Sequence, residues 1–456
     1  MNEKNTRVVI IFFMAIVTAI ITATSCLAAN GAVVGDLDRF PQSADTYLPV
    51  APDSLIVSLA EQGVYADEFM ANYFAPWRNE DLSYLDISLD KIATWHKNLA
   101  KKKYYNAKGV ALPNDSMTNI LANGTIKTDA SPRPGVCLSD ADVRVLPTET
   151  RVFSSAAAAK GDRGLLKLDQ LQNSTIKPGE PLAIFAHSKD DKWLFAATGA
   201  VLGWIKAEKA ALVDEDFMEK YMYASYAVFV KDNVGISEKN GTVTATAKMG
   251  TILPIEGADL LMPAVGKNGM ASAVPYRPKA GEVDLFPVVF TPRNAARAMD
   301  ELIGEPYGWG GAGGLRDCSA MTRDYFSLFG VWLPRNSADQ AASGAVVSLE
   351  NTPVGERPRT IVENGVPFAT LIHMPGHIML YLGVYDGEPV VFHNTWGVRV
   401  TDGGNAGRLV IGKAVISSLR AGEEIKNRPK SSLYIDNVDK LAFPIGGIGN
   451  RLGLAR

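Results

Sequence analysis

Cysteine is scarce in this chain, whose 456 residues include only Cys26, Cys137 and Cys318. Cys26 lies in an N-terminal segment that we expect to be removed or lipidated, so the mature chain cannot be a disulfide scaffold. Cys137 stands between Val136 and Leu138, which favours a buried apolar residue. Cys318 is therefore the cysteine whose reactivity has to be explained.

The chain also lacks an excess of charge of either sign. It carries 46 basic and 49 acidic residues, for a formal net charge of −3, so nucleic acid is a poor partner. Its cysteines, histidines and carboxylates do not recur at metal-ligand spacing, so we expect neither a metal nor another cofactor. Apolar residues make up 47% and charged residues 21%, as in folded globular proteins, and the length predicts about three or four domains.

Only one segment of the chain is apolar for long enough to suggest targeting. Lys4 and Arg7 precede an apolar run from Val8 to Val17, and small residues follow. This order predicts a secretory signal peptide over 1–29 and export to the periplasm or cell envelope. An uncleaved membrane anchor is the alternative. The stretch ending at Cys26 also loosely resembles a bacterial lipobox, and lipidation there is the one route to membrane attachment that we expect.

The remaining chain divides by texture into four parts. Residues 30–135 are predicted to be mostly helical, and the clearest helix spans 88–101, with Ser88 as its N-cap and an apolar face that we expect to comprise Leu89, Ile92, Trp95 and Leu99. His96 on that helix is interpreted as a surface or packing residue. Short β segments separated by Gly, Pro and Asp predict two small barrels, over 136–215 and 216–290. Residues 291–456 form the fourth part.

The fourth part places Cys318 after a glycine-rich loop and at the beginning of a predicted helix. Asp317 is the expected N-cap, residues 319–329 have helical periodicity, and Gly330 supplies a stop. Unpaired N–H groups and the helix dipole at this position favour a thiolate. We therefore expect Cys318 to be a nucleophile with a lowered pKa.

Three of the five histidines follow Cys318 within a short stretch. His377 begins a predicted strand and His393 lies on its hairpin partner, so His377 can act as base and His393 as the group that orients it. A two-residue Asp386-Gly387 turn would put the two imidazoles on opposite faces of the hairpin. We predict a three-residue loop, 385–387, which puts them on the same face, or else another odd-length loop or a bulge. His373 is expected to lie in a loop outside the strand, without a direct role.

The order of the motifs in this part resembles one known family. The motifs are Tyr307-Gly308-Trp309-Gly310-Gly311, Asp317-Cys318-Ser319, Leu333-Pro334-Arg335-Asn336-Ser337 with Gln340, and the strand begun by His377 with His393 after it. Over about 291–419 they are similar to the NlpC/P60 family of papain-like cell-wall cysteine peptidases. Upstream, Trp193 and Gly203-Trp204-Ile205 resemble bacterial SH3 domains. The resemblance implies an α+β chain with a papain-like NlpC/P60 catalytic domain, preceded by two small SH3-like β-barrels and a mostly helical N-terminal region.

The resemblance also implies roles for individual residues. Cys318 would be the nucleophile, His377 the base, His393 the third polar residue, and Tyr307 a group near the oxyanion. The whole chain is similar to γ-D-glutamyl-L-diamino-acid endopeptidases, which cleave peptidoglycan stem peptides. The positions that would contact substrate are Asp317, Ser319, Asn336 and Ser337.

One of these substrate positions departs from the family pattern. Several relatives have Asp where this chain has Asn336, and that carboxylate binds the ammonium of a free N-terminal alanine. Glu149, in a loop of the first barrel, is the candidate replacement. Two other functions stay open, namely an amidase or acyltransferase on the same fold and a non-catalytic scaffold that binds envelope peptides.

Overall fold

The N-terminal part of the chain is helical. The computed structural model describes residues 34–127, 129–237, 243–266 and 268–446, so the predicted signal peptide and Cys26 lie outside the described residues. Among the described helices, none is long and apolar enough to cross a membrane. The first elements are α1 (Asp36–Arg39), η1 (Ala44–Tyr47), α2 (Leu59–Tyr73), α3 (Ala75–Arg78), η2 (Ser83–Leu85), α4 (Leu89–Ala100) and α5 (Ser116–Asn123).

Helix α4 confirms its predicted N-cap but not its predicted buried face. The Ser88 side chain accepts a hydrogen bond from the Lys91 N–H. Trp95, however, is 44% exposed, whereas His96 is 2% exposed and packs edge-on against Phe195 of the first barrel. The helix buries its face against a neighbouring domain, and this contact selects His96 over Trp95. Burial lowers the pKa of His96 to about 4, so the imidazole is neutral.

The first barrel is a seven-stranded sheet in the order β3-β2-β6-β5-β4-β1-β7. Trp204 is fully buried in its core, as is Cys137, so the apolar interpretation of Cys137 is confirmed. An insertion carrying a short helix and a 3-10 turn separates β2 from β3. The elements are β1 (Arg133–Cys137), β2 (Ala141–Arg144), α6 (Ala156–Lys160), η3 (Asp162–Gly164), β3 (Gln172–Ile176), β4 (Pro181–His187), β5 (Trp193–Ala197), β6 (Leu202–Lys206), η4 (Ala207–Lys209) and β7 (Ala210–Leu212).

The second barrel combines a five-stranded sheet, β13-β12-β11-β8-β14, with the β9–β10 pair. Its core is formed by Phe229, Leu253 and neighbouring apolar residues. The elements are α7 (Glu215–Met222), β8 (Tyr226–Phe229), β9 (Val234–Ser237), β10 (Val243–Ala247), β11 (Ile252–Glu256), β12 (Asp259–Val265), β13 (Ala271–Tyr276) and β14 (Val283–Leu285).

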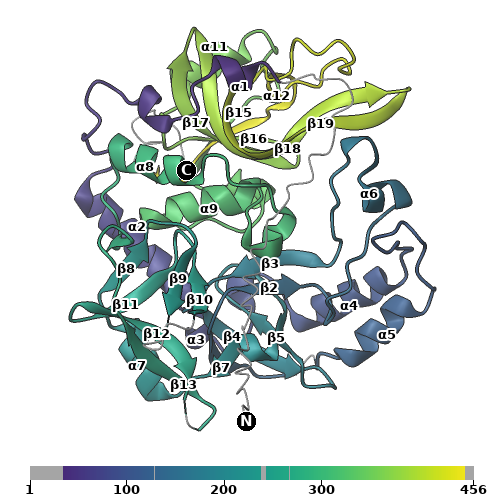
Figure 1. The fold of residues 1–456 in the computed structure, drawn as a ribbon. Helices are drawn as coiled ribbons and strands as arrows, with labels where there is room; N and C mark the ends of the chain where they lie inside the picture. Colours follow the sequence, from purple (N-terminus) through teal and green to yellow (C-terminus); the bar gives the residue numbers. More distant parts are fainter. Residues whose placement is uncertain (1–33, 128, 238–242, 267, 447–456) are drawn as a thin grey trace, which may run out of the picture. The chain divides into compact units, whose positions relative to one another are not determined.

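The C-terminal domain packs helices against a six-stranded antiparallel sheet, β15-β20-β16-β17-β18-β19. Its elements are α8 (Pro292–Leu302), η5 (Trp309–Gly314), α9 (Cys318–Leu328), α10 (Ser337–Gln340), β15 (Ala345–Ser348), α11 (Arg357–Asn364), β16 (Leu371–Met374), β17 (His377–Tyr385), β18 (Glu388–Asp402), β19 (Asn405–Ser418), α12 (Tyr434–Asn437) and β20 (Lys440–Phe443). Strands β18 and β19 form a long hairpin (Figure 1).

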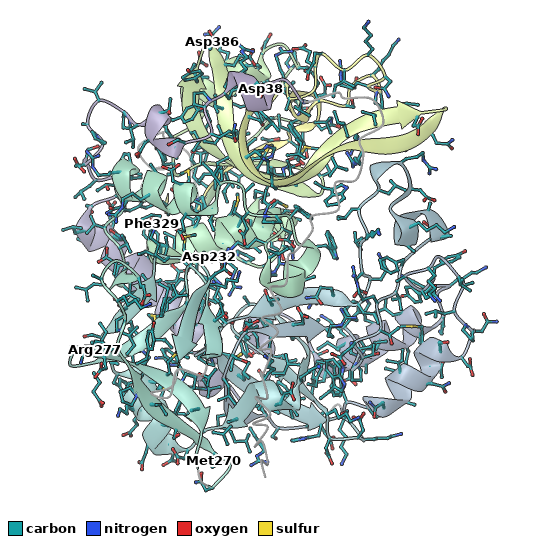
Figure 2. The ribbon with its side chains drawn as sticks, viewed as in Figure 1. Asp38, Asp232, Met270, Arg277, Phe329 and Asp386 are labelled. Carbon is teal, nitrogen blue, oxygen red and sulfur yellow. The ribbon has the colours of Figure 1, made fainter. Side chains whose placement is uncertain are left out.

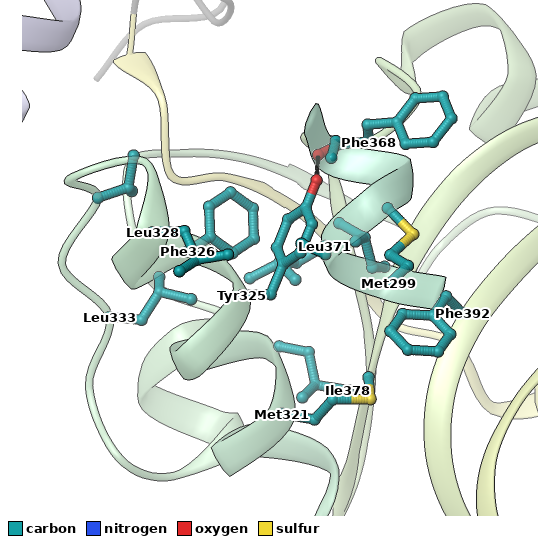
Figure 3. Packing of buried hydrophobic residues seen from close by; sticks show 14 of the residues in the cluster. Met299, Met321, Tyr325, Phe326, Leu328, Leu333, Phe368, Leu371, Ile378 and Phe392 are labelled. Atoms are coloured by element: carbon teal, nitrogen blue, oxygen red, sulfur yellow. Dashed lines mark hydrogen bonds between the residues drawn. The ribbon is translucent and has the colours of Figure 1, made fainter. Parts of the chain in front are cut away.

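The core of this domain fixes α9 to the sheet. Met321 and Tyr325 on α9 are buried with Ile378 of β17 and Phe392 of β18 (Figure 3). The Tyr325 hydroxyl donates to the carbonyl oxygen of Phe368 at 2.7 Å. Because α9 begins at Cys318, this packing also fixes the position of the thiol relative to β17.

A buried charge cluster joins the C-terminal domain to both barrels. The Arg316 guanidinium pairs with Asp232 of the second barrel and with Glu305 and Asp324 of its own domain, at 2.7 to 2.8 Å. Lys177 of the first barrel also pairs with Asp324. Figure 2 labels Asp232, where the second barrel meets this cluster. Arg316, two positions before Cys318, thus binds the second barrel directly and is linked to the first barrel through Asp324 and Lys177.

Candidate active site

The loop before α9 positions Cys318 at the first residue of the helix. Asp317 is the N-cap, as predicted, and accepts a hydrogen bond from the Ala320 N–H at 2.9 Å. Its second carboxylate oxygen accepts from the Gly310 N–H at 3.1 Å. Gly310 has a φ of 58° and Gly311 a φ of 79°, a left-handed backbone that suits glycine, so the glycine-rich loop can fold back onto the start of the helix.

The predicted three-residue loop of the β17–β18 hairpin is wrong, but the bulge that we named as its alternative is present. The turn itself has two residues, because Tyr385 pairs with Glu388. One of the two, Asp386, is labelled in Figure 2. A bulge between Tyr381 and Gly383 then shifts the register, so that Leu380 pairs with Phe392. Continued to the start of β17, this register opposes His377 to Thr395. The bulge therefore places His377 on the same face of the sheet as His393.

The two imidazoles are in direct contact. The Nε2 of His377 lies 2.8 Å from the Nδ1 of His393, and the Nε2 of His393 lies 3.0 Å from the Ser417 Oγ. Tyr434 stacks on the His377 ring at 5.7 Å and meets the His393 ring edge-on at 5.1 Å. Residues from β17, β18, β19 and α12 thus hold both rings in place.

The hydrogen bonds at Ser417 fix which nitrogens carry protons. The Ser417 hydroxyl donates to the carbonyl oxygen of Ser418, so its oxygen accepts from the Nε2–H of His393. His393 then accepts at Nδ1 from the Nε2–H of His377. This arrangement leaves Nδ1 of His377 as the nitrogen that can take a proton. The backbone N–H of the next residue, Ile378, bonds to the Cys318 thiol, so the thiol and the His377 imidazole belong to one site.

The expected thiolate is not the resting state. Cys318 is 6% exposed, and burial, with the Asp317 carboxylate beside it, raises the pKa of the thiol to about 12. The helix N-terminus favours the thiolate, but withdrawal of the sulfur from water outweighs that effect. Burial, with His373 and Arg408 nearby, lowers the pKa of His377 to about 4. The resting pair is a neutral thiol beside a neutral imidazole.

These protonation states predict the acid limb of any reaction that uses His377 as base. Only the neutral imidazole can accept a proton, and it is lost as the pH falls through the pKa of His377. We therefore expect kcat/KM to stay level at neutral pH and to fall with a midpoint near the pKa of about 4. A kcat/KM profile measured with a peptide substrate from pH 3 to pH 8 tests this. A midpoint at the ordinary histidine pKa would contradict the burial of the base.

Tyr307 is close enough to Cys318 to affect its chemistry. Burial, together with the neighbouring Cys318 and Asp317, raises the pKa of the Tyr307 hydroxyl well above its usual range. The hydroxyl is therefore protonated at every working pH and can only donate to an anion. The Tyr307 ring meets Trp396 of β18 edge-on at 6.1 Å. Tyr307 is thus a suitable hydrogen-bond donor beside the thiol.

Arg335 binds two predicted substrate positions, Asp317 and Ser319, and also a serine of the first barrel. Its guanidinium donates to both carboxylate oxygens of Asp317, at 3.1 and 2.8 Å, and to the Ser319 Oγ at 3.0 Å. It also donates to Ser174 of the first barrel at 2.7 Å. Burial of Asp317 opposes its ionisation, but the Arg335 guanidinium holds the pKa of Asp317 below its ordinary value. Asp317 and Ser319 are therefore held in a fixed, charged network at the junction with the first barrel.

A second connection to the first barrel was missed by sequence analysis. The Arg144 guanidinium binds Asp169 at 2.7 Å and Gln172 at 2.9 Å, and the Gln172 side chain donates to the carbonyl oxygen of Gly310 at 3.0 Å. Arg144, Asp169 and Gln172 are all buried, and buried polar side chains need hydrogen-bond partners such as these. The signal in the sequence was the polar run 169–174, but its partners are far away in the chain.

Three predicted substrate positions lie at the ends of elements or in loops. Asn336 is the N-cap of α10 and accepts from the Asp339 N–H at 3.0 Å, while its amide nitrogen donates to the Asp339 carboxylate. Ser337 begins that helix. Glu149 is exposed and pairs with Lys206 of its own barrel at 2.5 Å. The carboxylate that is hydrogen-bonded to Asn336 is that of Asp339.

His373 does not occupy the predicted loop. It lies on β16, is 6% exposed, and its Nδ1 is 2.7 Å from the Asp439 carboxylate. The segment 374–376 makes a tight β16–β17 turn in which Met374 pairs with His377, so the strand extends through the residue that sequence analysis placed outside it. His373 lies in the sheet beside β17.

Family models match all four parts of the chain. Residues 304–407 match the NlpC/P60 family. The C-terminal domain is an NlpC/P60 domain. Residues 8–129 match the N-terminal NLPC_P60 stabilising domain, residues 151–206 an SH3 domain of the SH3b1 type, and residues 214–259 an SH3 domain of the SH3b2 type. The predicted fold class is confirmed.

Known proteins support the same assignment. An NlpC/P60 endopeptidase from Photobacterium damselae subsp. piscicida has the same fold, with a TM-score of 0.80 and 24% identity over 89% of this chain and 97% of that one. Two proteins from strains of Corynebacterium glutamicum, both described as a "Probable endopeptidase", are 29% and 28% identical over 136 and 134 residues, or 29% of this chain. The chain spans 63% of the length of these curated relatives.

Proposed function

We propose that the chain is an exported cysteine endopeptidase that hydrolyses peptidoglycan stem peptides. The bond we assign is the one between the γ-carboxyl of D-glutamate and a diamino acid such as meso-diaminopimelate. The observation that carries the proposal is the 2.8 Å contact between His377 and His393, beside a cysteine at the start of a helix in an NlpC/P60 domain. The family's relatives described as endopeptidases agree with this chemistry.

In the proposed reaction, attack by sulfur and transfer of its proton occur together. The Cys318 thiol gives its proton to Nδ1 of His377 as sulfur bonds to the scissile carbonyl carbon, because neither a free thiolate nor a protonated imidazole is stable in this buried site. His393 accepts from the Nε2–H of His377 and stabilises the imidazolium that forms. The Cys318 N–H and the Tyr307 hydroxyl are the donors available to the oxyanion.

Collapse of the tetrahedral intermediate transfers the proton from His377 to the leaving amine. The diamino acid departs and leaves an L-Ala-γ-D-Glu thioester on Cys318. A water molecule, deprotonated by His377, then attacks the thioester carbonyl, and the sulfur leaves with the returned proton. One amide bond and one water are consumed, and the enzyme is regenerated.

Product analysis of defined peptides tests this function. The purified protein is incubated with L-Ala-γ-D-Glu-meso-diaminopimelate and with its N-acetylated form, and the products are identified by mass spectrometry. We expect L-Ala-D-Glu and free diaminopimelate from the first peptide. Cleavage at another bond would contradict the assigned specificity, and binding of the peptide without cleavage would favour a non-catalytic scaffold.

The acetylated peptide addresses the position at which this chain departs from the family. Asn336 is neutral, but its amide is bonded to the Asp339 carboxylate, so a negative charge is present beside it. We propose that selectivity for a free amine survives through Asp339. Equal hydrolysis of both peptides would contradict this selectivity while leaving the assigned bond intact.

A further inference from the structure

Two arginines face one another on the long β18–β19 hairpin. Arg399 of β18 pairs directly with Arg408 of β19. Like charges at directly opposed positions destabilise a strand pair, and arginine cannot relieve the repulsion by losing its proton at ordinary pH. Such a pair calls for a compensating anion.

The described part of the chain provides Arg408 with no such anion. Burial, together with Arg399, lowers the pKa of the Arg408 guanidinium, and Tyr434 is the one group that acts in the opposite direction. Arg408 is half-buried, so its charge is only partly solvated. This contrasts with Arg335 and Arg316, which each bind carboxylates of neighbouring elements.

The alternation of β18 places this pair on the catalytic face. Side chains two residues apart in a strand point to the same side, and β18 carries on one side His393, Thr395, Gly397 and Arg399. The β18–β19 pairing has one bulge, and its extra residue is in β19, where Ile411 and Gly412 oppose Trp396. The alternation of side chains along β18 is therefore not interrupted. Gly397 has no side chain because the backbone of β19 comes close there: a Cβ would meet the Leu409 carbonyl oxygen at 2.2 Å.

Contacts around Tyr434 bring Arg408 close to the base. Tyr434 donates to or accepts from Thr395 at 2.9 Å and stacks on His377. The charge of Arg408 lowers the pKa values of both His377 and Tyr434. Among the described residues, a guanidinium without a carboxylate partner therefore lies on the same face of the sheet as the two imidazoles, within electrostatic range of the Tyr434 ring that supports them.

The first barrel holds this part of the hairpin in position. The Arg163 Nε donates to the carbonyl oxygen of Ala406 at 3.2 Å, and the Trp396 Nε1 donates to that of Gly164 at 2.7 Å. A Cβ on Gly164, whose φ is 72°, would meet the Arg408 carbonyl oxygen at 2.3 Å. Turn η3 is thus fitted against the edge of β19, so Arg408 extends from a supported strand.

We propose that Arg408, with Arg399 beside it, binds a free carboxylate of the substrate. The inference rests on the proposed function and adds a specificity-determining residue to it. A glutamate linked through its γ-carboxyl keeps its α-carboxylate free, and diaminopimelate contributes further carboxylates across the scissile bond. A guanidinium recognises either group through two parallel hydrogen bonds.

Amidated peptides distinguish the two sources of the carboxylate. The parent tripeptide is compared with one analogue in which the D-glutamate α-carboxylate is a carboxamide and another in which the diaminopimelate carboxylates are carboxamides. kcat and KM are measured for the unaltered protein, Arg408→Gln, Arg408→Lys and Arg399→Gln. Arg420→Gln, which removes an exposed arginine paired with Glu423, is the matched control.

We expect Arg408→Gln to lower kcat/KM for the parent peptide by about 10- to 100-fold, the usual effect of losing a charged hydrogen bond. The same substitution should have little effect on the analogue whose carboxylate is already neutral, and that analogue identifies the group bound. Arg408→Lys should recover part of the loss. Thermal unfolding should show an intact fold, because removing one of two opposed like charges does not destabilise the hairpin.

Three results would overturn the inference. An equal loss on all three peptides would show a structural role for Arg408, and no loss on any would show that it does not touch the substrate. Both leave the proposed function standing if the unaltered protein cleaves the parent tripeptide. Failure of the unaltered protein to cleave any of the peptides would contradict the proposed function, and this inference would fall with it.

Discussion

Replacing Cys318 with alanine is expected to lower the cleavage of the stem tripeptide by at least about 10⁴-fold, since the substitution removes the proposed nucleophile. The side chain is small and lies at the start of α9, so the packing of Met321 and Tyr325 in Figure 3 should not change. Peptide binding should therefore survive. Mass spectrometry of the products measures the first effect, and calorimetric titration with the uncleaved peptide measures the second.

Cys137 provides the matched control for this substitution. It is also buried, but it lies in the first barrel, where its sulfur donates to the carbonyl oxygen of Ser139. Cys137→Ala should keep full activity per folded molecule even if its stability drops. Cleavage by Cys318→Ala at the rate of the unaltered protein would remove the nucleophile from the account, whereas loss of activity in both variants would indicate a folding defect.

Replacing Arg316 with glutamine is expected to cost about 3 to 5 kcal/mol in the free energy of unfolding. Arg316 is 3% exposed and pairs with Asp232, Glu305 and Asp324, and removing one member of a buried ionic cluster leaves the others without compensation. Although burial opposes ionisation, Lys177 and Arg316 lower the pKa of Asp324 to about 2. After the substitution Asp324 keeps its pair with Lys177 but loses its contact with Arg316.

Chemical denaturation followed by fluorescence measures this loss of stability. Arg293→Gln is the control, because Arg293 pairs with Asp53 at an exposed position and such pairs contribute about 1 kcal/mol or less. Equal midpoints for the two variants would contradict the assigned role of Arg316 in joining the domains. The carbonyl oxygen of Arg316 accepts a hydrogen bond from the Asn394 side chain, next to His393 on β18, at 2.9 Å. A destabilised Arg316 variant should therefore lose activity as well.

Sequence analysis could predict features that depend on neighbouring residues in the chain. The N-caps Ser88 and Asp317, the barrels and the β17–β18 irregularity follow from local spacing and from the requirement that two histidines share a face. The buried face of α4 could not be predicted in the same way. Both Trp95 and His96 fit a helical stripe, and only the first barrel, through Phe195, decides which of them is buried.

The electrostatics of the site also depended on the folded structure. The position of Cys318 in the first turn predicted a lowered pKa, but the sequence does not show how completely the sulfur is removed from water. His373 was assigned to a loop because Pro375 and Gly376 follow it, whereas the strand ends one residue later. Arg408 carried no local signal, since its significance comes from its place opposite Arg399 and from the lack of a carboxylate partner within the part of the chain that the structure describes.

The central claim is that the Cys318 sulfur itself attacks the scissile carbonyl with His377 as base. Rapid acid quenching of the protein during turnover of L-Ala-γ-D-Glu-meso-diaminopimelate, followed by peptide mapping with mass spectrometry, tests it most directly. The account predicts an L-Ala-γ-D-Glu acyl group on the peptide that contains Cys318. An acyl group on any other residue, or turnover with the Cys318 thiol alkylated beforehand, would contradict it.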